Sequence, residues 1–289
     1  MIGHLVVVGV GLIGGSFALE LKKKHLVERV TGVGRSRANL EKARELGIID
    51  AVSGSVSQAV GDADLVLLAT PVGAMAEVFR AMAPVLSPDC IVTDAGSTKQ
   101  DVVAAARAGL GEKIGRFVPA HPIAGAESSG AEAARAGLYH HKPCVLTPLP
   151  ENAAAVVATV RDLWRACGAQ VTEMDAARHD RVFAAVSHLP HLVAFALVDE
   201  LAGRPDADTY FRHAGSGFRD FTRIAGSHPE MWRDISLANR DALAAELGTF
   251  IAKLSSLREM LAAGDSQALE GLFARARQAR HTWIKGRQH

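Results

Sequence analysis

The sequence predicts an α/β protein in which a doubly wound, mostly parallel sheet comes first and an all-helical domain follows. From residue 4 to about residue 174, short apolar runs rich in valine and isoleucine alternate with helical patterns. Most of these runs are apolar throughout, which is typical of strands in a parallel sheet whose two faces are covered by helices. From about residue 175 the strand pattern is absent. We therefore expect two domains, residues 1–174 and residues 175–289.

Seven segments carry the strand pattern, and the later helical patterns carry apolar residues three and four apart. The strands are expected at residues 4–8, 29–33, 64–69, 90–94, 116–120, 144–147 and 170–174. The clearest helical stripe, within residues 238–263, consists of Leu243, Leu247, Phe250, Ile251, Leu254, Leu257 and Leu261. This spacing places the side chains on one face of a helix. The face can be ordinary core or a contact surface for a second copy of the chain.

The charge balance argues against two classes of partner. The 289 residues hold 32 Lys and Arg against 31 Asp and Glu, so no general field attracts nucleic acid or an anionic membrane surface. No apolar run reaches the length of about 18 residues that spans a bilayer. The N-terminus lacks the basic residues and the cleavage site of a signal peptide. We expect a small-molecule ligand and no membrane.

The cysteine content indicates the redox compartment. Cys90, Cys144 and Cys167 lie far apart in the sequence and show no spacing typical of metal ligands. An odd number of scattered thiols is typical of a reducing environment. We expect a cytoplasmic protein.

A glycine-rich motif joins the first expected strand to the first helix. Gly9, Gly11 and Gly14 form G-x-G-x-x-G, with Leu12 and Ile13 between the last two. In this position the first glycine allows a tight turn, the second lets a pyrophosphate approach the backbone, and the third lets helix and strand pack closely. The N-terminus of the helix then offers free N–H groups to the phosphates. The motif predicts a Rossmann-type dinucleotide site, although the glycines alone could be structural.

The end of the second expected strand indicates which dinucleotide is bound. An acidic residue there would hold the ribose of NAD, but the chain has Arg35, Ser36 and Arg37 instead. These side chains can donate charge-assisted hydrogen bonds to a 2′-phosphate. NADP is therefore favoured and NAD remains possible. Alternatively, both arginines cap or solvate the following helix.

Further polar residues stand at the carboxyl ends of expected strands, where ligands of such sheets bind. Thr70 and Pro71 end one strand and are expected beside the nicotinamide. Ser97 follows another strand, and it is either a site residue or only a helix N-cap. His121 lies between two short turns, with Glu127 six residues further on. An imidazole held in this way suits proton transfer near neutral pH.

The helical domain contributes a second group of histidines. His188 and His191 are three residues apart, and Pro190 between them is expected to kink the helix. Zinc sites favour histidines four apart with a nearby acid, so no metal is expected here. The two rings can be core residues, but two on one apolar helix favour the lining of a site.

A cationic pair follows later in the helical domain. Arg219 and Arg223 are one helical turn apart, and Trp232 comes nine residues after the second. Guanidinium groups bind carboxylates in bidentate fashion, so the three side chains could clamp and cover a dianion. Alternatively, the arginines pair at the surface with Asp220 and Asp234.

Five ordered motifs, covering nearly the whole chain, resemble those of the prephenate and arogenate dehydrogenases of tyrosine biosynthesis. The motifs are GVGLIGGS, TDAGSTK, PAHPIAGAESSG, VSHLPHLVAFAL and GFRDFTRIA. The resemblance implies that His121 accepts the proton of the substrate's ring hydroxyl and that Ser97 hydrogen-bonds to both groups. It also implies that Glu127 gates the site and that His191 and Arg223 hold the substrate.

The resemblance extends to the rest of the pocket and to the assembly. His188, Arg219 and Trp232 match nearby pocket positions of that family. The family's helical domain usually forms a dimer, so we expect a homodimer. Many members carry an acid after the second strand, and its absence from this sequence is a departure that favours NADP.

The implied reaction is the oxidative decarboxylation of prephenate to 4-hydroxyphenylpyruvate, of arogenate to tyrosine, or of both. The hydride passes to NAD(P), His121 takes the hydroxyl proton, and loss of carbon dioxide makes the ring aromatic without a metal. Two alternatives stay open. A β-hydroxyacid or imine reductase shares the glycine loop and a helical second domain, but commonly uses a lysine there. A regulator could also bind NADP without turning it over.

Overall fold

The computed structural model describes residues 1–125 and 129–286, and it divides into two compact units. The first unit is Met1–Arg240 and the second is Asp241–His289. The first unit contains both sheets of the protein and the helices up to residue 238. The second contains two long helices.

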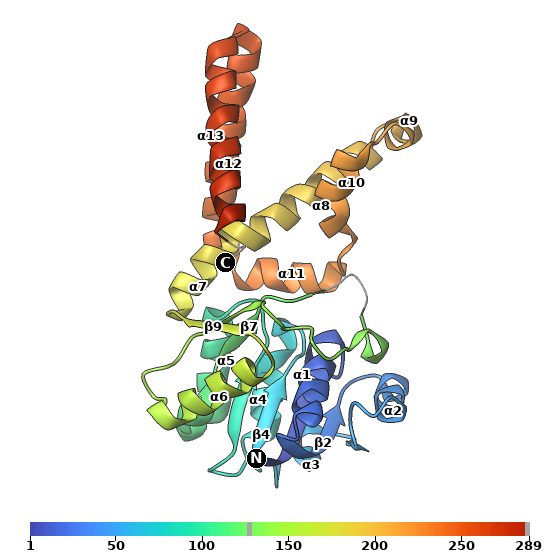
Figure 1. Ribbon diagram of the computed structural model, residues 1–289, viewed down its shortest axis with the longest axis vertical. Coiled ribbons are helices and arrows are strands. Elements are labelled where there is room, and N and C mark those ends of the chain that lie inside the picture. The colour runs from blue at the N-terminus through green and yellow to red at the C-terminus, as the bar shows by residue number, and fades with distance from the viewer. Residues whose placement is uncertain (126–128, 287–289) are drawn as a thin grey trace. The chain divides into compact units, whose positions relative to one another are not determined.

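The main sheet has six strands, all parallel, in the order β3-β2-β1-β4-β5-β6 (Figure 1). The strands are β1 Ile2–Val8, β2 Val27–Val33, β3 Ala51–Val52, β4 Leu65–Leu68, β5 Ile91–Asp94 and β6 Phe117–Val118. This order is that of a doubly wound dinucleotide-binding sheet. The predicted fold class is therefore confirmed, although β3, with only two residues, escaped the sequence pattern.

Helices cover both faces of this sheet, which explains the continuous apolar runs of its central strands. Leu5 and Val7 of β1 belong to one apolar cluster, and Val6 and Val8 belong to another. Successive side chains of a strand point to opposite faces, so both faces require apolar residues. The helices of this part are α1 Leu12–Lys23, α2 Arg37–Glu45, α3 Val56–Ala59, α4 Met75–Met82, α5 Gln100–Leu110 and α6 Ala154–Ala166.

A separate three-stranded sheet carries His121. Its order is β7-β8-β9, with β7 antiparallel to β8 and β8 parallel to β9. The strands are β7 Ala120–Pro122, β8 Pro143–Leu146 and β9 Gln170–Glu173. The expectation of one strand over residues 116–120 was wrong, because the segment divides at Pro119 between β6 of the main sheet and β7 of the small one. Proline has no N–H with which to continue a ladder, so the chain changes partners there.

The remainder of the first unit is helical, as predicted. Its elements are α7 Ala176–Phe183, a π-helical turn Ala184–His188, α8 Leu189–Ala202, α9 Ala207–Arg212, α10 Ser216–Thr222, a 3₁₀ turn Arg223–Gly226 and α11 Pro229–Ala238. The predicted distortion near Pro190 lies one turn earlier than expected, in the π-helical turn. Pro190 cannot donate to the carbonyl of Val186, so the hydrogen-bond ladder shifts before it.

One helix differs from the expectation that no segment is long and apolar enough to span a membrane. The continuous helix Ala176–Ala202 has a mean hydropathy of 1.6 over 18 residues. By length and composition alone, this helix is long and apolar enough to cross a bilayer. It was not anticipated because its apolar run is interrupted by histidine and serine. Core helices of globular proteins also pass this test, so it is weak evidence for a membrane span.

The second unit consists of α12 Arg240–Ala263 and α13 Ser266–Lys285. Gly264 lies between them at a φ of +64°, and the side chain of Asp265 caps α13 by accepting from the N–H of Ala268. Of the α12 residues described, Leu243 is the buried one, whereas Leu254 is 48% exposed. The predicted stripe is present, but it does not form a core within this unit.

Candidate active site

The glycine loop after β1 has the geometry of a cofactor cradle. Gly9 has a φ of +99°, and a Cβ there would lie 2.5 Å from the carbonyl oxygen of Ala69. A Cβ at Gly14 would lie 2.4 Å from the carbonyl oxygen of Gly9. At Gly11, by contrast, the nearest atom to a Cβ is 4.0 Å away. The fold itself therefore requires glycine at positions 9 and 14, whereas at position 11 the space is open to a ligand.

The N-terminus of α1 opens onto this loop. Gly11 is its N-cap, and within the described part of the chain no side chain caps the helix. Leu12 points into the core, and the carbonyl of Ile13 accepts a hydrogen bond of 2.6 Å from Tyr139. The residues present fit a dinucleotide, because the helix offers N–H groups and a partial positive charge where a pyrophosphate would lie.

The residues predicted to choose the dinucleotide partly serve the next helix. Ser36 is the N-cap of α2 and accepts from the N–H of Asn39, and Arg37 forms an exposed ion pair of 2.6 Å with Glu41. The alternative considered for this segment is therefore present in the structure for Arg37. Arg35 is exposed. An exposed ion pair of this kind contributes little free energy, so it does not prevent Arg37 from contacting an anion.

Thr70 and Pro71 follow β4 at the same edge of the sheet. Thr70 is half-buried, and within the described residues its hydroxyl has no hydrogen-bond partner. The 3₁₀ turn Val72–Ala74 comes next, and α11 packs against it, with Asp234 close to Gly73. This arrangement brings α11 over the carboxyl end of β4 (Figure 1).

A buried ion pair holds the strand that carries His121. Lys99 donates to Asp94 over 2.5 Å, and both side chains are fully buried. The same carboxylate accepts from the backbone N–H of Gly96 and, through its other oxygen, from that of Ala120. Asp94 therefore connects the end of β5 to the start of β7. Sequence reasoning assigned no role to this pair.

Ser97 is half-buried between these two residues, and it does not cap α5. The first N–H groups of that helix are taken by a distant carboxylate, because Asp180 accepts from Lys99 and from Gln100. The alternative that Ser97 is only an N-cap is therefore wrong. Its hydroxyl is left for another role.

His121 belongs to a buried chain of hydrogen bonds. Its Nδ1 lies 2.8 Å from Nε2 of His179, and Nδ1 of His179 lies 2.8 Å from a carboxylate oxygen of Asp180. The ring of Phe183 packs against both imidazoles, at centroid distances of 4.7 and 4.4 Å. His121 is 8% exposed, whereas His179 is completely buried. The imidazole of His121 is thus held from one side by other side chains.

The surroundings of these groups set their charge. Burial lowers the pKa of His121 well below its usual value, and electrostatic interactions with His179 and Lys99 lower it further. Burial also lowers the pKa of His179, although the hydrogen bond to Asp180 opposes this. Burial disfavours the ionised form of Asp180, but hydrogen bonds from His179 and from the backbone of α5 outweigh it and lower the pKa. At neutral pH the site therefore holds neutral imidazoles and a carboxylate.

The histidines of the helical part lie against Trp232. The ring of His191 stacks on the indole at a centroid distance of 3.6 Å, and its Nδ1 hydrogen-bonds to the carbonyl of Ser187. His188 is almost completely buried and its Nδ1 lies 3.1 Å from the side-chain amide of Asn239. Burial lowers the pKa of His191, as does the positive charge of Arg223. His188, His191 and Trp232 thus lie together, and Arg223 is close enough to His191 to affect its pKa.

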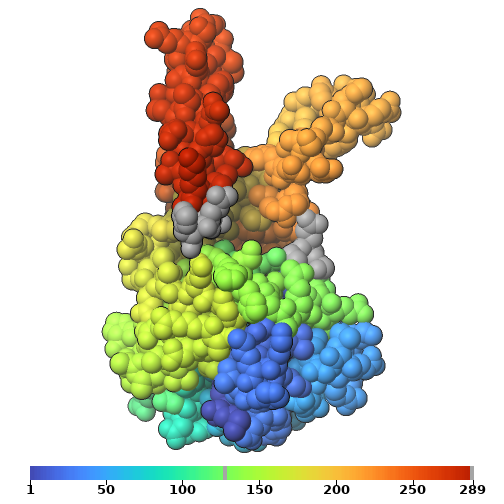
Figure 2. Space-filling view, viewed as in Figure 1, coloured from blue at the N-terminus to red at the C-terminus, as the bar shows by residue number. Residues whose placement is uncertain are grey.

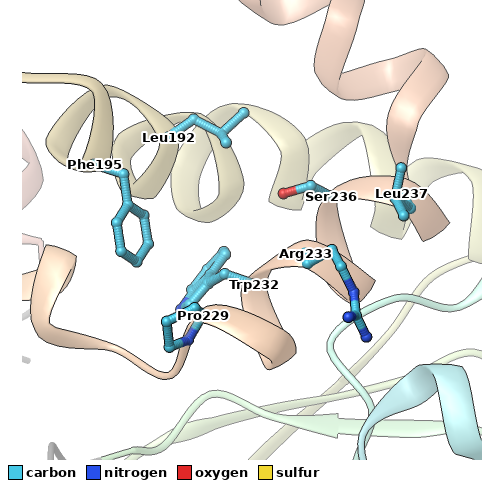
Figure 3. A pocket seen from close by; sticks show the side chains of 7 residues that line it. All are labelled: Leu192, Phe195, Pro229, Trp232, Arg233, Ser236 and Leu237. Atoms are coloured by element: carbon cyan, nitrogen blue, oxygen red, sulfur yellow. The ribbon is translucent and has the colours of Figure 1, made fainter. Parts of the chain in front are cut away.

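An apolar pocket of about 360 Å³ lies beside them, between α8 and α11 (Figure 3). Trp232 forms one wall and Phe195 faces it from α8. The complete lining is Leu192, Phe195, Pro229, Trp232, Arg233, Ser236 and Leu237. Trp232 both lines this pocket and stacks on His191.

One predicted site residue, Arg219, is not gathered into this region by the structure. Arg219 is on α10 with its side chain 79% exposed, and it pairs with Asp220, as the surface alternative had it. Asp234 forms an ion pair of 2.7 Å with Arg233. Glu127 lies outside the described residues. Among the residues that are described, no group of three or more His, Cys, Asp and Glu side chains could hold a metal ion.

Comparison with known proteins identifies the family. The profile of the prephenate dehydrogenase nucleotide-binding domain matches residues 17–173, and that of the prephenate dehydrogenase dimerization domain matches residues 175–275. The chain belongs to the prephenate dehydrogenase family. It is accordingly an oxidoreductase that uses a nicotinamide dinucleotide, which agrees with the cradle after β1.

Members of the prephenate dehydrogenase family resemble the chain over nearly its full length. It is 38% identical to a cyclohexadienyl dehydrogenase of Zymomonas mobilis, over 96% of this chain and 94% of that one. A crystal structure of prephenate dehydrogenase from A. aeolicus with hydroxyphenyl propionate and NAD+ has a TM-score of 0.89 and 37% identity, covering 99% and 98%. An arogenate dehydrogenase from Synechocystis has a TM-score of 0.81 and 29% identity, covering 97% and 99%.

The structure also contains site residues that sequence reasoning missed. His179 and Asp180 touch or support His121, and Asn239 holds His188 and also the carbonyl of Asp180. The available signal was the adjacent pair His179-Asp180 at the start of the helical part, which combines an imidazole with a carboxylate. Nothing local in the sequence shows which distant groups such a pair contacts.

Proposed function

We propose that this protein oxidatively decarboxylates prephenate, arogenate or both, with hydride transfer to a nicotinamide dinucleotide, and that His121 is the general base. The observation that carries the proposal is the position of His121 on β7, anchored at the edge of the sheet where the cofactor cradle lies. When bound, the nicotinamide accepts the hydride. His121 is neutral at neutral pH and can take the proton of the ring hydroxyl as that hydride leaves.

The remaining site residues receive roles by their placement. Ser97 offers a hydroxyl that does not cap a helix, so it can hydrogen-bond to the substrate hydroxyl. His191, fixed by its stack on Trp232 and by donating from Nδ1 to the carbonyl of Ser187, can accept at Nε2 from a donor group of the substrate. Arg223 can hold a carboxylate of the substrate, because a guanidinium donates to oxygen anions. His188 lines the same region. Orienting the substrate in this way supplies an entropic part of catalysis.

Arg219 and Glu127 complete the proposed site. We keep Arg219 as a pocket residue, since its exposed pair with Asp220 can exchange for a ligand. We keep Glu127 as a gating acid on the family resemblance alone.

We propose that NADP is preferred over NAD. The chain has no acid from Gly34 to Arg37, and Arg35 is exposed at the end of β2. Steady-state rates with the two cofactors test this directly: kcat/KM is expected to be higher with NADP, and Arg35→Ala is expected to lower it for NADP while leaving NAD nearly unchanged. A higher kcat/KM with NAD in the unaltered protein would contradict the assignment.

We also propose the assembly, the domain division and the compartment. A homodimer through the helical part is supported by exposed apolar side chains on α12 and α13, among them Leu261, Phe273 and Trp283. Figure 2 shows the part of the chain that contains these two helices in orange-red and red. A functional boundary near residue 174 is supported by the two family profiles, which meet there.

The three cysteines are free and buried, which supports a cytoplasmic location.

The decisive experiment follows nicotinamide reduction with prephenate and with arogenate. His121→Asn keeps a side-chain amide that can still donate a hydrogen bond to Nε2 of His179, but it removes the base. We expect kcat to fall about 10²–10⁴-fold, the usual contribution of general base catalysis, with cofactor affinity nearly unchanged. An unaltered kcat in this variant would exclude His121 as the base, and absence of turnover with both substrates in the unaltered protein would exclude the reaction.

A further inference from the structure

A buried histidine and a buried aspartate stand behind His121 in a chain of hydrogen bonds. His179 and Asp180 both belong to α7, and neither is accessible to a small molecule. They contact His121 through a single line of hydrogen bonds, each of 2.8 Å. The reaction proposed above gives these two residues no role.

The direction of every hydrogen bond in this line can be assigned from its end. Asp180 accepts from the backbone N–H of Lys99 at 2.8 Å and from that of Gln100 at 2.9 Å, so both of its oxygens are occupied as acceptors. An ionised carboxylate can only accept. Nδ1 of His179 must therefore donate to Asp180, which leaves Nε2 of this neutral ring as an acceptor. Nδ1 of His121 must then donate to that Nε2.

This order of donors fixes the state of the other nitrogen of His121. A neutral imidazole carries one proton, so a ring that donates from Nδ1 has a free lone pair at Nε2. We infer that His179 and Asp180 are positioning residues that hold His121 in the Nδ1–H tautomer and so present an unprotonated Nε2 to the substrate hydroxyl. The inference rests on the proposed role of His121 as the base.

The same line also accommodates the proton once it has moved. The O–H bond of the substrate breaks, an N–H bond forms at Nε2, and His121 becomes an imidazolium that still donates to His179. The carboxylate of Asp180 faces the far side of His179 and stabilises this positive charge. Electrostatic interactions with Lys99 and His188 disfavour the imidazolium of His121. The buried ion pair with Asp94 neutralises the charge of Lys99.

A structural alternative is that Asp180 merely caps α5 and that His179 merely fills space beside Phe183. The positioning role requires a hydrogen-bond acceptor at the place of Nε2 of His179, whereas the packing role does not. In glutamine the amide oxygen reaches about the place of a histidine Nε2, and in asparagine it reaches about the place of Nδ1. His179→Gln can therefore still accept from His121, whereas His179→Asn can contact only Asp180.

The matched pair is compared by steady-state kinetics with prephenate and a nicotinamide dinucleotide. We expect His179→Asn to lower kcat by about 10²-fold or more, because loss of the orienting partner allows the wrong tautomer. We expect His179→Gln to retain kcat within about tenfold, and both variants to keep KM within about threefold. Equal losses in the two variants, with equal melting temperatures, would overturn the inference in favour of a packing role.

A second measurement does not depend on turnover. In protein labelled with ¹⁵N-histidine, the signals of His121 are those absent from His121→Asn. We expect Nδ1 of His121 to carry the proton at neutral pH and Nε2 to carry none. A proton on Nε2 would overturn the inference. If the tautomer is as expected but neither prephenate nor arogenate is oxidised, the proposed function fails and the positioning of His121 stands.

Discussion

His188 should make the folded protein sensitive to acid. It is 1% exposed on the π-helical turn, and burial lowers its pKa from 6.5 to about 4. The folded chain therefore binds a proton at this ring less readily than the unfolded chain does. The stabilisation that results is present above pH 6.5, the value for the unfolded chain, and is lost as the pH falls towards 4.

The magnitude follows from the two pKa values. The gap between 6.5 and about 4 corresponds to about 3 kcal/mol of unfolding free energy when the ring is fully titrated. Between pH 7 and about pH 4.5 the loss from this ring alone is about 2 kcal/mol. Other buried groups such as His121 add to the total, so the contribution of His188 has to be isolated by difference.

Urea unfolding of the unaltered protein and of His188→Asn at both pH values provides that difference. In the variant the amide oxygen can still accept from Asn239, which now contacts a group that does not titrate. We expect the unaltered protein to lose about 2 kcal/mol more than His188→Asn on acidification. His213→Asn, at an exposed position, is the matched control and should behave like the unaltered protein. Equal acid losses in all three proteins would refute the reasoning.

Two further predictions concern the loop after β1 and the buried ion pair. A Cβ at Gly11 meets no atom closer than 4.0 Å, whereas one at Gly14 meets the Gly9 carbonyl at 2.4 Å. Gly11→Ala should therefore keep the melting temperature of the unaltered protein but lose affinity for the dinucleotide, measured by fluorescence titration. Gly14→Ala should lower the melting temperature itself. Lys99→Met leaves the carboxylate of Asp94 buried and unpaired, so chemical denaturation should show a loss of about 3–5 kcal/mol, and adding Asp94→Asn should recover part of it. Equal melting temperatures of the two glycine variants, or no effect of Lys99→Met, would contradict these explanations.

The parts of the fold that the sequence predicted are those with a local signal. Strands buried on both faces carry continuous apolar runs, so β1 and β4, with Leu5–Val8 and Leu65–Leu68, were recognisable along the chain. The glycine loop was recognisable because tight backbone approaches tolerate no side chain at Gly9 and Gly14. The two-residue β3 was missed because so short a strand has no periodicity.

The candidate site divides in the same way. His121 was identified because prolines and a strand end surround it in the sequence. Its partner His179 is 58 residues away, and the carboxylate that caps α5 comes from 81 residues beyond Lys99. No periodicity connects positions so far apart, so neither contact could be predicted. For Ser97 the sequence left the cap open, and the distant Asp180 decided against it.

The sequence by itself determined the fold class, the dinucleotide loop and the histidine that is suited to proton transfer, because apolar periodicity and glycine requirements act over a few neighbouring residues. Only the tertiary structure decided that a proline divides one expected strand between two sheets, that the stripe on α12 stays uncovered within its own unit, and which nitrogen of His121 donates. These features arise from packing between distant segments, where burial leaves each polar atom with the partner that the fold brings to it.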